Sequence, residues 1–169
     1  MLISPKYLVE NEIITFPDNI IIGEHIQQNG IDIDCFELTH LSYKTVPVIF
    51  KDSSVKPEPI LLKPTKITKP GEKDINGWLL KKGEVYSFNS SFEIKIPKNM
   101  GGQVVGRSTF NRQGILVRSS WFDSGFKGTL GATVYCFNDV FIEQGVRIGQ
   151  FIMHSGESAG LYTVQYQSK

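Results

Sequence analysis

Residues 102–118, GQVVGRSTFNRQGILVR, contain the pattern that decides how this chain is expected to fold. Two apolar stretches of strand length, Gly102–Gly106 and Ile115–Arg118, stand at its ends. Between them, Ser108 is a good helix N-cap whose hydroxyl can satisfy free amides of a first turn, and Gly114 can end such a helix. The stretch therefore predicts a strand, one short helix and a second strand.

Outside this stretch, short runs rich in Val, Ile, Phe, Tyr and Thr are separated by Gly, Pro, Asn and Asp. This spacing is typical of an all-β protein. We expect one domain over residues 1–169, a distorted jelly-roll or β-clip barrel with one short helix and a flexible tail from about residue 155. Exposed loops are expected at Lys51–Pro59 and Lys63–Asp74, which are rich in Lys and Pro. The other expected strands are Ile20–Ile22, Ile31–Phe36, Val46–Phe50, Ile60–Leu62, Glu84–Phe88, Phe92–Ile96, Thr129–Phe137, Val140–Ile142 and Arg147–Met153.

The composition of the chain argues against two classes of protein, binders of polymeric nucleic acid and membrane-spanning proteins. Eighteen Lys and Arg against seventeen Asp and Glu leave a net charge of +1, so the broad basic surface of a polymeric nucleic-acid binder is not expected. No apolar run approaches the roughly 20 residues of a membrane-spanning helix. The first residues also lack the basic-then-apolar order of a signal peptide. We expect a cytoplasmic protein without membrane partners.

The metal-ligating residue types are scattered along the chain. Cys35 and Cys136 have no CxxC neighbour, and His25, His40 and His154 lack the spacing of the zinc-dependent deaminases. Neither a disulfide framework nor a zinc site is predicted, and the cysteines are interpreted as small buried apolar residues.

Three segments could carry chemistry. Gly106–Gly114 joins a cation and two hydroxyls to an expected helix N-terminus, which suits a phosphate. Trp121–Gly128 places Asp123 among aromatic residues and glycines that allow a close backbone approach. Gln144–Gln150 leads into the last long strand. Taken singly, each is also explained by an ordinary turn.

Taken in order, these segments resemble the motif series of the dUTPase and dCTP deaminase superfamily. Gly106–Thr109 is similar to its GRSS or PRSG phosphate motif, Phe122–Gly128 to IDxGYxG, and Gly145–Gln150 to GxRIxQ. Ile26–Ile33 resembles the early strand whose Asp matches Asp32. Two further segments, Leu80–Phe88 and Ser91–Pro97, resemble the strand pair before the phosphate motif. The resemblance covers most of the chain.

The resemblance implies a homotrimer with active sites between subunits. The substrate would be dUTP or dCTP, with Mg²⁺ bound through the triphosphate and not by protein ligands. The resemblance also implies that Asp123 is catalytic, as the partner of the 3′-hydroxyl or of the attacking water, and that Asp32 lies behind the direct contacts. The implied phosphate contacts are Arg107, Ser108, Thr109 and Gln150. The implied nucleoside contacts are Val117, Arg118, Trp121, Phe122 and Phe126, with backbone pairing to the pyrimidine edge and Phe126 on the deoxyribose, where many relatives have Tyr.

The two activities of the superfamily need different chemistry. Its deaminases use a Glu in the strand after IDxGYxG, but residues 129–137, TLGATVYCF, contain no acid. Thr133 or Tyr135 stands at the matching position, depending on the end from which one counts, and no Glu occurs between Glu93 and Glu143. Diphosphate hydrolysis needs an oriented water, a carboxylate and cations, which this chain can supply. We therefore expect a dUTP diphosphatase that forms dUMP and pyrophosphate.

Two alternatives stay open. Ser108 and Arg112 keep the spacing of the deaminase Ser and Arg, which fits a dCTP deaminase, alone or bifunctional. A non-catalytic nucleotide-binding or structural homologue would keep the fold without turnover. The Gly-rich closing motif of dUTPases is poorly matched by Gly156–Gly160, so the role of the tail is left open.

Overall fold

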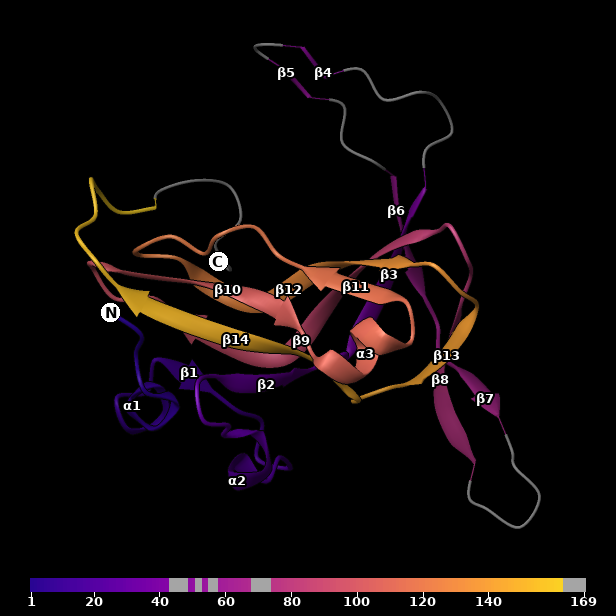
Figure 1. Ribbon diagram of the computed structural model, residues 1–169, viewed down its shortest axis with the longest axis horizontal. Coiled ribbons are helices and arrows are strands. Elements are labelled where there is room, and N and C mark those ends of the chain that lie inside the picture. Colours follow the sequence, from indigo (N-terminus) through magenta and orange to yellow (C-terminus); the bar gives the residue numbers. More distant parts are fainter. Residues whose placement is uncertain (43–48, 51–52, 55–57, 68–73, 163–169) are drawn as a thin grey trace.

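Two long neighbouring strands, β9 (Val85–Lys95) and β12 (Lys127–Cys136), form the centre of the fold. The computed structural model describes residues 1–42, 49–50, 53–54, 58–67 and 74–162 (Figure 1). The two strands pair antiparallel and bury alternate side chains, so that one face of each is apolar. Phe88 and Phe92 of β9 and Leu130 of β12 lie fully inside the core.

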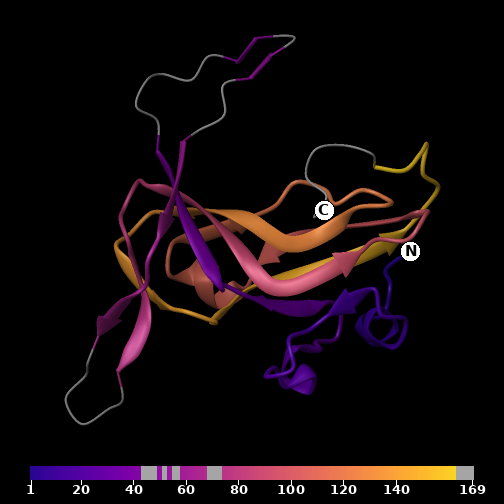
Figure 2. The same ribbon diagram turned by 180° about the vertical axis from the view of Figure 1, so that it is seen from behind.

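The main sheet extends on both sides of this pair. Its order is β2 (Ile31–Asp34), β14 (Arg147–Ser155), β10 (Met100–Gly106), β11 (Ile115–Arg118), β12, β9, β3 (Glu37–Ser42) and β6 (Glu58–Leu62), and β1 (Ile14–Thr15) also pairs with β9. Figures 1 and 2 show that this sheet is strongly curled. The expected all-β fold of the jelly-roll or barrel kind is therefore confirmed.

Two smaller sheets are separate from the main one. The first has the order β13 (Val140–Glu143), β8 (Ile75–Leu80) and β7 (Thr65–Ile67), and the second joins β4 (Ile49–Phe50) to β5 (Ser53–Ser54). The loop expected at Lys63–Asp74 thus contains β7. Most of the strand expected at Val46–Phe50 and of the loop expected at Lys51–Pro59 lies outside the described residues.

The short helix predicted between Ser108 and Gly114 is confirmed as α3 (Ser108–Arg112), but the described residues form two more helices, α1 (Pro5–Glu10) and α2 (Ile22–His25), that were not predicted. Pro5 opens α1, where its fixed φ suits the first turn. The strand expected at Ile20–Ile22 was wrong. Ile21 and Ile22 are exposed, so the apolar run there does not report a buried strand.

The strands expected separately at Glu84–Phe88 and Phe92–Ile96 form one continuous β9. The polar residues between them do not break the strand, because Ser90 is buried and its hydroxyl bonds within the strand. Its Oγ accepts from the Phe92 amide at 3.1 Å and lies 3.2 Å from the Phe92 carbonyl. A buried hydroxyl with its own partner fits an apolar face.

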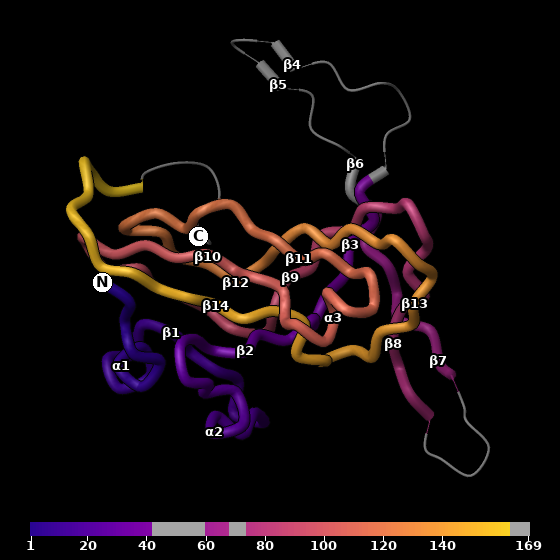
Figure 3. The backbone as a smooth tube through the Cα atoms, viewed as in Figure 1, coloured from indigo at the N-terminus to yellow at the C-terminus, as the bar shows by residue number. Residues whose placement is uncertain are grey.

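The N-terminus is joined to the end of β14. The Met1 ammonium donates a hydrogen bond to the Ser155 carbonyl at 2.8 Å, and Leu2 forms a β-bridge with His154. Figure 3 shows the two segments meeting at one end of the molecule. None of the helices in the described part of the chain is long and apolar enough to cross a membrane.

Candidate active site

A polar cavity lies where β10 ends and α3 begins. It brings together the four residues predicted to hold phosphate and the acid predicted to lie behind them, although they come from three separate parts of the chain. Its lining residues are Gln27, Asp32, Val105, Gly106, Arg107, Ser108, Thr109 and Gln150. We call it the phosphate cavity. Gln27 had not been singled out, although it lies within the early strand motif.

Asp32 organises the floor of the phosphate cavity. Its side chain is buried, and its two oxygens face Arg107 Nε at 3.4 Å and Gln150 Nε2 at 3.3 Å. Arg107 Nη1 donates to the Arg147 carbonyl at 3.1 Å. A guanidinium has five N–H donors, so Arg107 is held on one side and still has donors for a ligand. Asp32 thus contacts both the Arg107 guanidinium and the Gln150 amide of the phosphate cavity.

Ser108 does not cap α3, contrary to the prediction. Arg107 occupies the N-cap position, and its carbonyl accepts hydrogen bonds from the Phe110 and Asn111 amides. The Ser108 side chain is exposed and lines the cavity, which leaves its hydroxyl available to a ligand. Because α3 has only five residues, the side chains here matter more than the helix dipole.

A second cavity lies between the segment 119–122 and the outer face of β12. We call it the nucleoside cavity. It is lined by Trp121, Phe122 and Phe126, three of the residues for which the resemblance implies nucleoside contacts. The rest of its lining consists of Ser87, Asn89, Ser119, Ser120, Thr129, Gly131, Ala132 and Thr133.

Val117 and Arg118 do not reach the nucleoside cavity. Val117 is buried in the core, and Arg118 is paired with Val105 on one side and with Thr133 on the other. The β11 backbone is therefore paired on both sides at Arg118, and the segment that lines the nucleoside cavity begins one residue later, at Ser119. The sequence had not indicated Ser87 and Asn89, which reach the cavity through the pairing of β9 with β12.

Within the described part of the chain, no carboxylate lines the nucleoside cavity. Of the two positions at which a deaminase Glu could have been matched, Thr133 lines the cavity, whereas Tyr135 packs on Phe137 with ring centroids 4.8 Å apart. Of these two positions, the one that lines the cavity therefore carries a hydroxyl, which stays protonated at neutral pH.

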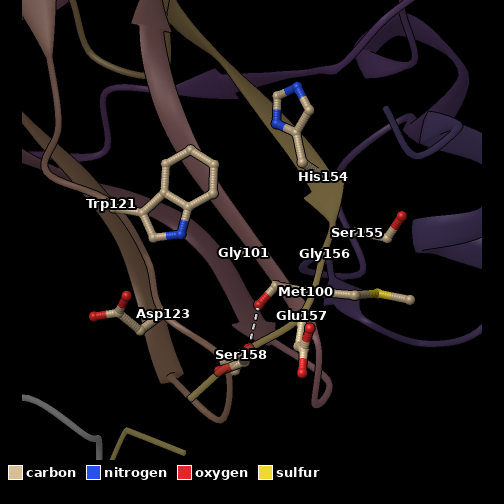
Figure 4. Close-up of a pocket in the computed structure, with 10 residues that line it drawn as sticks. Met100, Gly101, Trp121, Asp123, His154, Ser155, Gly156, Glu157 and Ser158 are labelled. Carbon is tan, nitrogen blue, oxygen red and sulfur yellow. Dashed lines mark hydrogen bonds between the residues drawn. The ribbon is translucent and has the colours of Figure 1, made fainter. Parts of the chain in front are cut away.

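Asp123 lies on a turn at the edge of a third cavity of about 240 Å³, shown in Figure 4. The turn closes with a hydrogen bond from the Phe126 amide to the Asp123 carbonyl at 3.0 Å. Ser124 ties it to β10, since its Oγ donates to the Met100 carbonyl at 2.7 Å. The Asp123 side chain is exposed, so it is free to meet a ligand.

The C-terminal segment folds back over this turn. Ser158 donates its amide to Asn99 Oδ1 at 3.3 Å, and Tyr162 donates its amide to the Ser124 carbonyl at 2.6 Å. The Tyr162 ring meets Phe126 edge-on at 5.9 Å. The described part of the expected flexible tail, up to residue 162, therefore contacts the turn of its own chain.

The chain does not bring Arg107 and Asp123 together. The phosphate cavity and the cavity at Asp123 share no lining residue, because they adjoin opposite ends of β10. Gly101 and Gly106 mark these ends, about 16 Å apart at the usual rise of an extended strand. Arg112 is exposed at the end of α3 and lines none of the three cavities.

No group of three or more His, Cys, Asp or Glu lies close enough to hold a metal ion, as far as the described residues go. The side-chain donors of the phosphate cavity are a guanidinium, two hydroxyls and two amides, which suit phosphate oxygens. A divalent cation that arrives on a phosphate chain needs no protein cage of its own.

Comparison with known proteins relates the chain to one family. A family model described as dCTP deaminase-like matches residues 8–156. A probable deoxyuridine 5′-triphosphate nucleotidohydrolase of Halobacterium salinarum is 28% identical over 74 residues, which cover 44% of this chain and 45% of that protein.

Among solved structures, the 2′-deoxycytidine 5′-triphosphate deaminase of Agrobacterium tumefaciens matches with a TM-score of 0.64 and 13% identity, over 92% of this chain and 48% of that one. A mutant dUTPase from phage phi11 of S. aureus, described with a structural Mg(II) ion, matches with a TM-score of 0.45 and 14% identity over 53% of this chain and 77% of that one. The chain thus spans about half the length of the curated relative and of the deaminase. The deaminase match supports the fold alone.

Proposed function

The chain belongs to the dCTP deaminase-like family, within the dUTPase and dCTP deaminase superfamily, and we propose that it hydrolyses dUTP to dUMP and pyrophosphate. The observation that carries this proposal is the composition of the nucleoside cavity. Thr133, one of the two positions that match the acid of a deaminating relative, lines the cavity, and none of the described residues that line it is a carboxylate. Deamination requires a group that moves protons between water, the ring nitrogen and ammonia, and Thr cannot act as that base at neutral pH.

Hydrolysis can be assigned to residues that are present. Water attacks the α-phosphorus in line, the bond from this phosphorus to the bridging oxygen breaks, and pyrophosphate leaves. Arg107, Ser108, Thr109 and Gln150 would hold the phosphate oxygens and stabilise the developing charge. Asp123 would orient the attacking water or the 3′-hydroxyl of the nucleotide. Mg²⁺ bound to the triphosphate would neutralise further charge on the leaving pyrophosphate.

We further propose that the active site forms between chains of a homotrimer. The separation of Arg107 from Asp123 within one chain supports this assignment, because one nucleotide must meet both groups. A second copy would bring its Asp123 turn to the phosphate cavity of the first.

A dCTP deaminase is the second candidate. The exposed Ser108 hydroxyl in the phosphate cavity favours it, since the deaminase spacing of Ser108 and Arg112 is kept. In a trimer, Arg112 could face the nucleoside cavity of another copy. This reading needs a proton-transfer group from outside the strand where the family carries its Glu.

The deciding experiment supplies the purified protein and Mg²⁺ with dUTP or dCTP and follows pyrophosphate and ammonia separately. Pyrophosphate from dUTP, reduced to a small residual rate in Asp123→Asn, is the expected result. Ammonia from dCTP, lost in Ser108→Ala or Arg112→Ala, would replace the proposal with the deaminase. Tight binding of either nucleotide without turnover would leave a non-catalytic nucleotide-binding homologue.

A further inference from the structure

The indole of Trp121 is held against the strand β10. A Cβ built on Gly101 would lie 2.2 Å from Trp121 Nε1, so only glycine allows this approach. The side chain is nevertheless 48% exposed, and burial alone does not explain its fixed place. A contact from a neighbouring side chain would hold this half-exposed ring in place.

His154, at the end of β14, supplies that contact. Its ring stacks on the indole with centroids 6.0 Å apart and an interplanar angle of 24° (Figure 4). His154 Nδ1 is shielded from solvent and has no hydrogen-bond partner among the described residues. A buried polar atom without a partner is unfavourable, so the position of this ring calls for an explanation other than Nδ1 hydrogen bonding.

Trp121 is linked directly to the turn that carries Asp123. The two residues are two apart in the sequence, and both line the cavity of Figure 4. Phe122 between them is fixed by two hydrogen bonds to Gly102, at 2.7 and 3.0 Å. The Asp123 carboxylate is exposed, and Figure 4 draws no hydrogen bond to it from the other labelled residues, so the backbone before and after it decides where the carboxylate lies.

Trp121 also lines the nucleoside cavity. Its indole therefore lines both that cavity and the one at Asp123, and His154, which stacks on the indole, lines the cavity at Asp123 as well. A shift of the indole would disturb both the surface that meets the nucleoside and the acid two residues later.

We propose that His154 is a positioning residue, which acts by stacking on Trp121 and so fixes the direction of the Asp123 carboxylate. The inference rests on the proposed function for the role of Asp123. It requires an aromatic ring at position 154 and does not require its nitrogens.

The test compares His154→Ala with His154→Phe, which keeps a ring and removes both nitrogens. The control is His40→Ala, because His40 also packs on an aromatic ring, that of Tyr86 at 5.1 Å, and lines none of the three cavities; its other contact is with Glu84, at 2.7 Å. The first measurement is acrylamide quenching of tryptophan fluorescence without nucleotide. It reports mainly Trp121, because Trp78 is only 3% exposed.

His154→Ala should increase the quenching and lower dUTP turnover by roughly 10- to 100-fold, the cost of a slightly misplaced catalytic group. His154→Phe should restore both, and His40→Ala should change neither. Added to Asp123→Asn, His154→Ala should cause little further loss, because both changes act on one group.

Unchanged quenching in His154→Ala, failure of His154→Phe to restore turnover in a folded protein, or additive losses with Asp123→Asn would each overturn the inference. A wild-type protein without turnover would overturn the proposed function instead. Quenching needs no nucleotide, so it would still decide whether His154 holds Trp121.

Discussion

The buried carboxylate of Asp32 touches both Arg107 and Gln150, so its charge should control nucleotide affinity. In Asp32→Asn the amide keeps the volume but no longer pairs with the guanidinium. The contact is an ion pair at 3.4 Å and not a hydrogen bond, so the substitution removes the charge that faces the guanidinium. The KM for the nucleotide should therefore rise by roughly 10-fold or more while the fold is kept, as measured by steady-state kinetics and circular dichroism.

Asp34 offers the matched control, since it is equally buried two residues along β2. Its oxygens accept hydrogen bonds from the Ser91 amide and hydroxyl, at 2.9 and 2.7 Å, away from the phosphate cavity. Asp34→Asn should lower the free energy of unfolding and leave KM unchanged. Equal effects of the two substitutions on KM would show that Asp32 has no special link to the nucleotide.

The two cysteines give a prediction about pH. Burial raises the pKa of Cys136 to about 11 and that of Cys35 well above its usual range. At pH 8 only about a thousandth of Cys136 is thiolate, the reactive form. Iodoacetamide should therefore modify the native protein very slowly and the urea-unfolded protein quickly, as followed by mass spectrometry.

The raised pKa of Cys136 also makes the free energy of unfolding fall as pH rises. The raised pKa means that the contribution of Cys136 is fully present below the pKa of the unfolded chain and is lost as pH rises through about 11. The midpoint of urea unfolding should fall above about pH 9, and less steeply in Cys136→Ala. Rapid labelling of the folded protein at pH 8 would contradict the burial of these thiols.

The short helix α3 depends on the residue that follows it. Gly114 has φ +74°, and a Cβ there would lie 2.6 Å from Asn138 Nδ2. Gly114→Ala should lower the free energy of unfolding by about 1–2 kcal/mol, because an L-residue is strained in this region. Gly156→Ala is the control, since no atom lies within 4 Å of its Cβ. Equal urea midpoints for the two variants would mean that α3 does not need the left-handed residue.

Elements made of contiguous residues could be predicted from the sequence, whereas those that depend on distant partners could not. The order of β10, α3 and β11 follows from local signals, and it places Arg107, Ser108 and Thr109 in one cavity. The continuity of β9 depends on where the Ser90 hydroxyl finds its partner, which no periodicity reveals. Ser87 and Asn89 reach the nucleoside cavity only through strand pairing, so they were missed.

At the scale of the whole molecule, the outer face of β11 and β12 exposes apolar side chains. Leu116 is 50% exposed and Phe137 54%, and Leu116 pairs across the strands with Tyr135, whose ring contacts Phe137. Clustered apolar surface of this kind usually marks a contact with another protein. It is a surface that the proposed trimer could cover.

The strongest test of the trimer uses two inactive chains. If each active site takes Arg107 from one chain and Asp123 from another, then Arg107→Ala and Asp123→Asn should complement each other after unfolding and refolding together. Random assembly at equal amounts leaves both residues intact in about one quarter of such sites, and the mixture should recover about that share of wild-type turnover. Mixing the folded variants without exchange of chains is the control and should stay inactive. If both residues instead came from the same chain, every site would carry one substitution, and the refolded mixture would be as inactive as its parents.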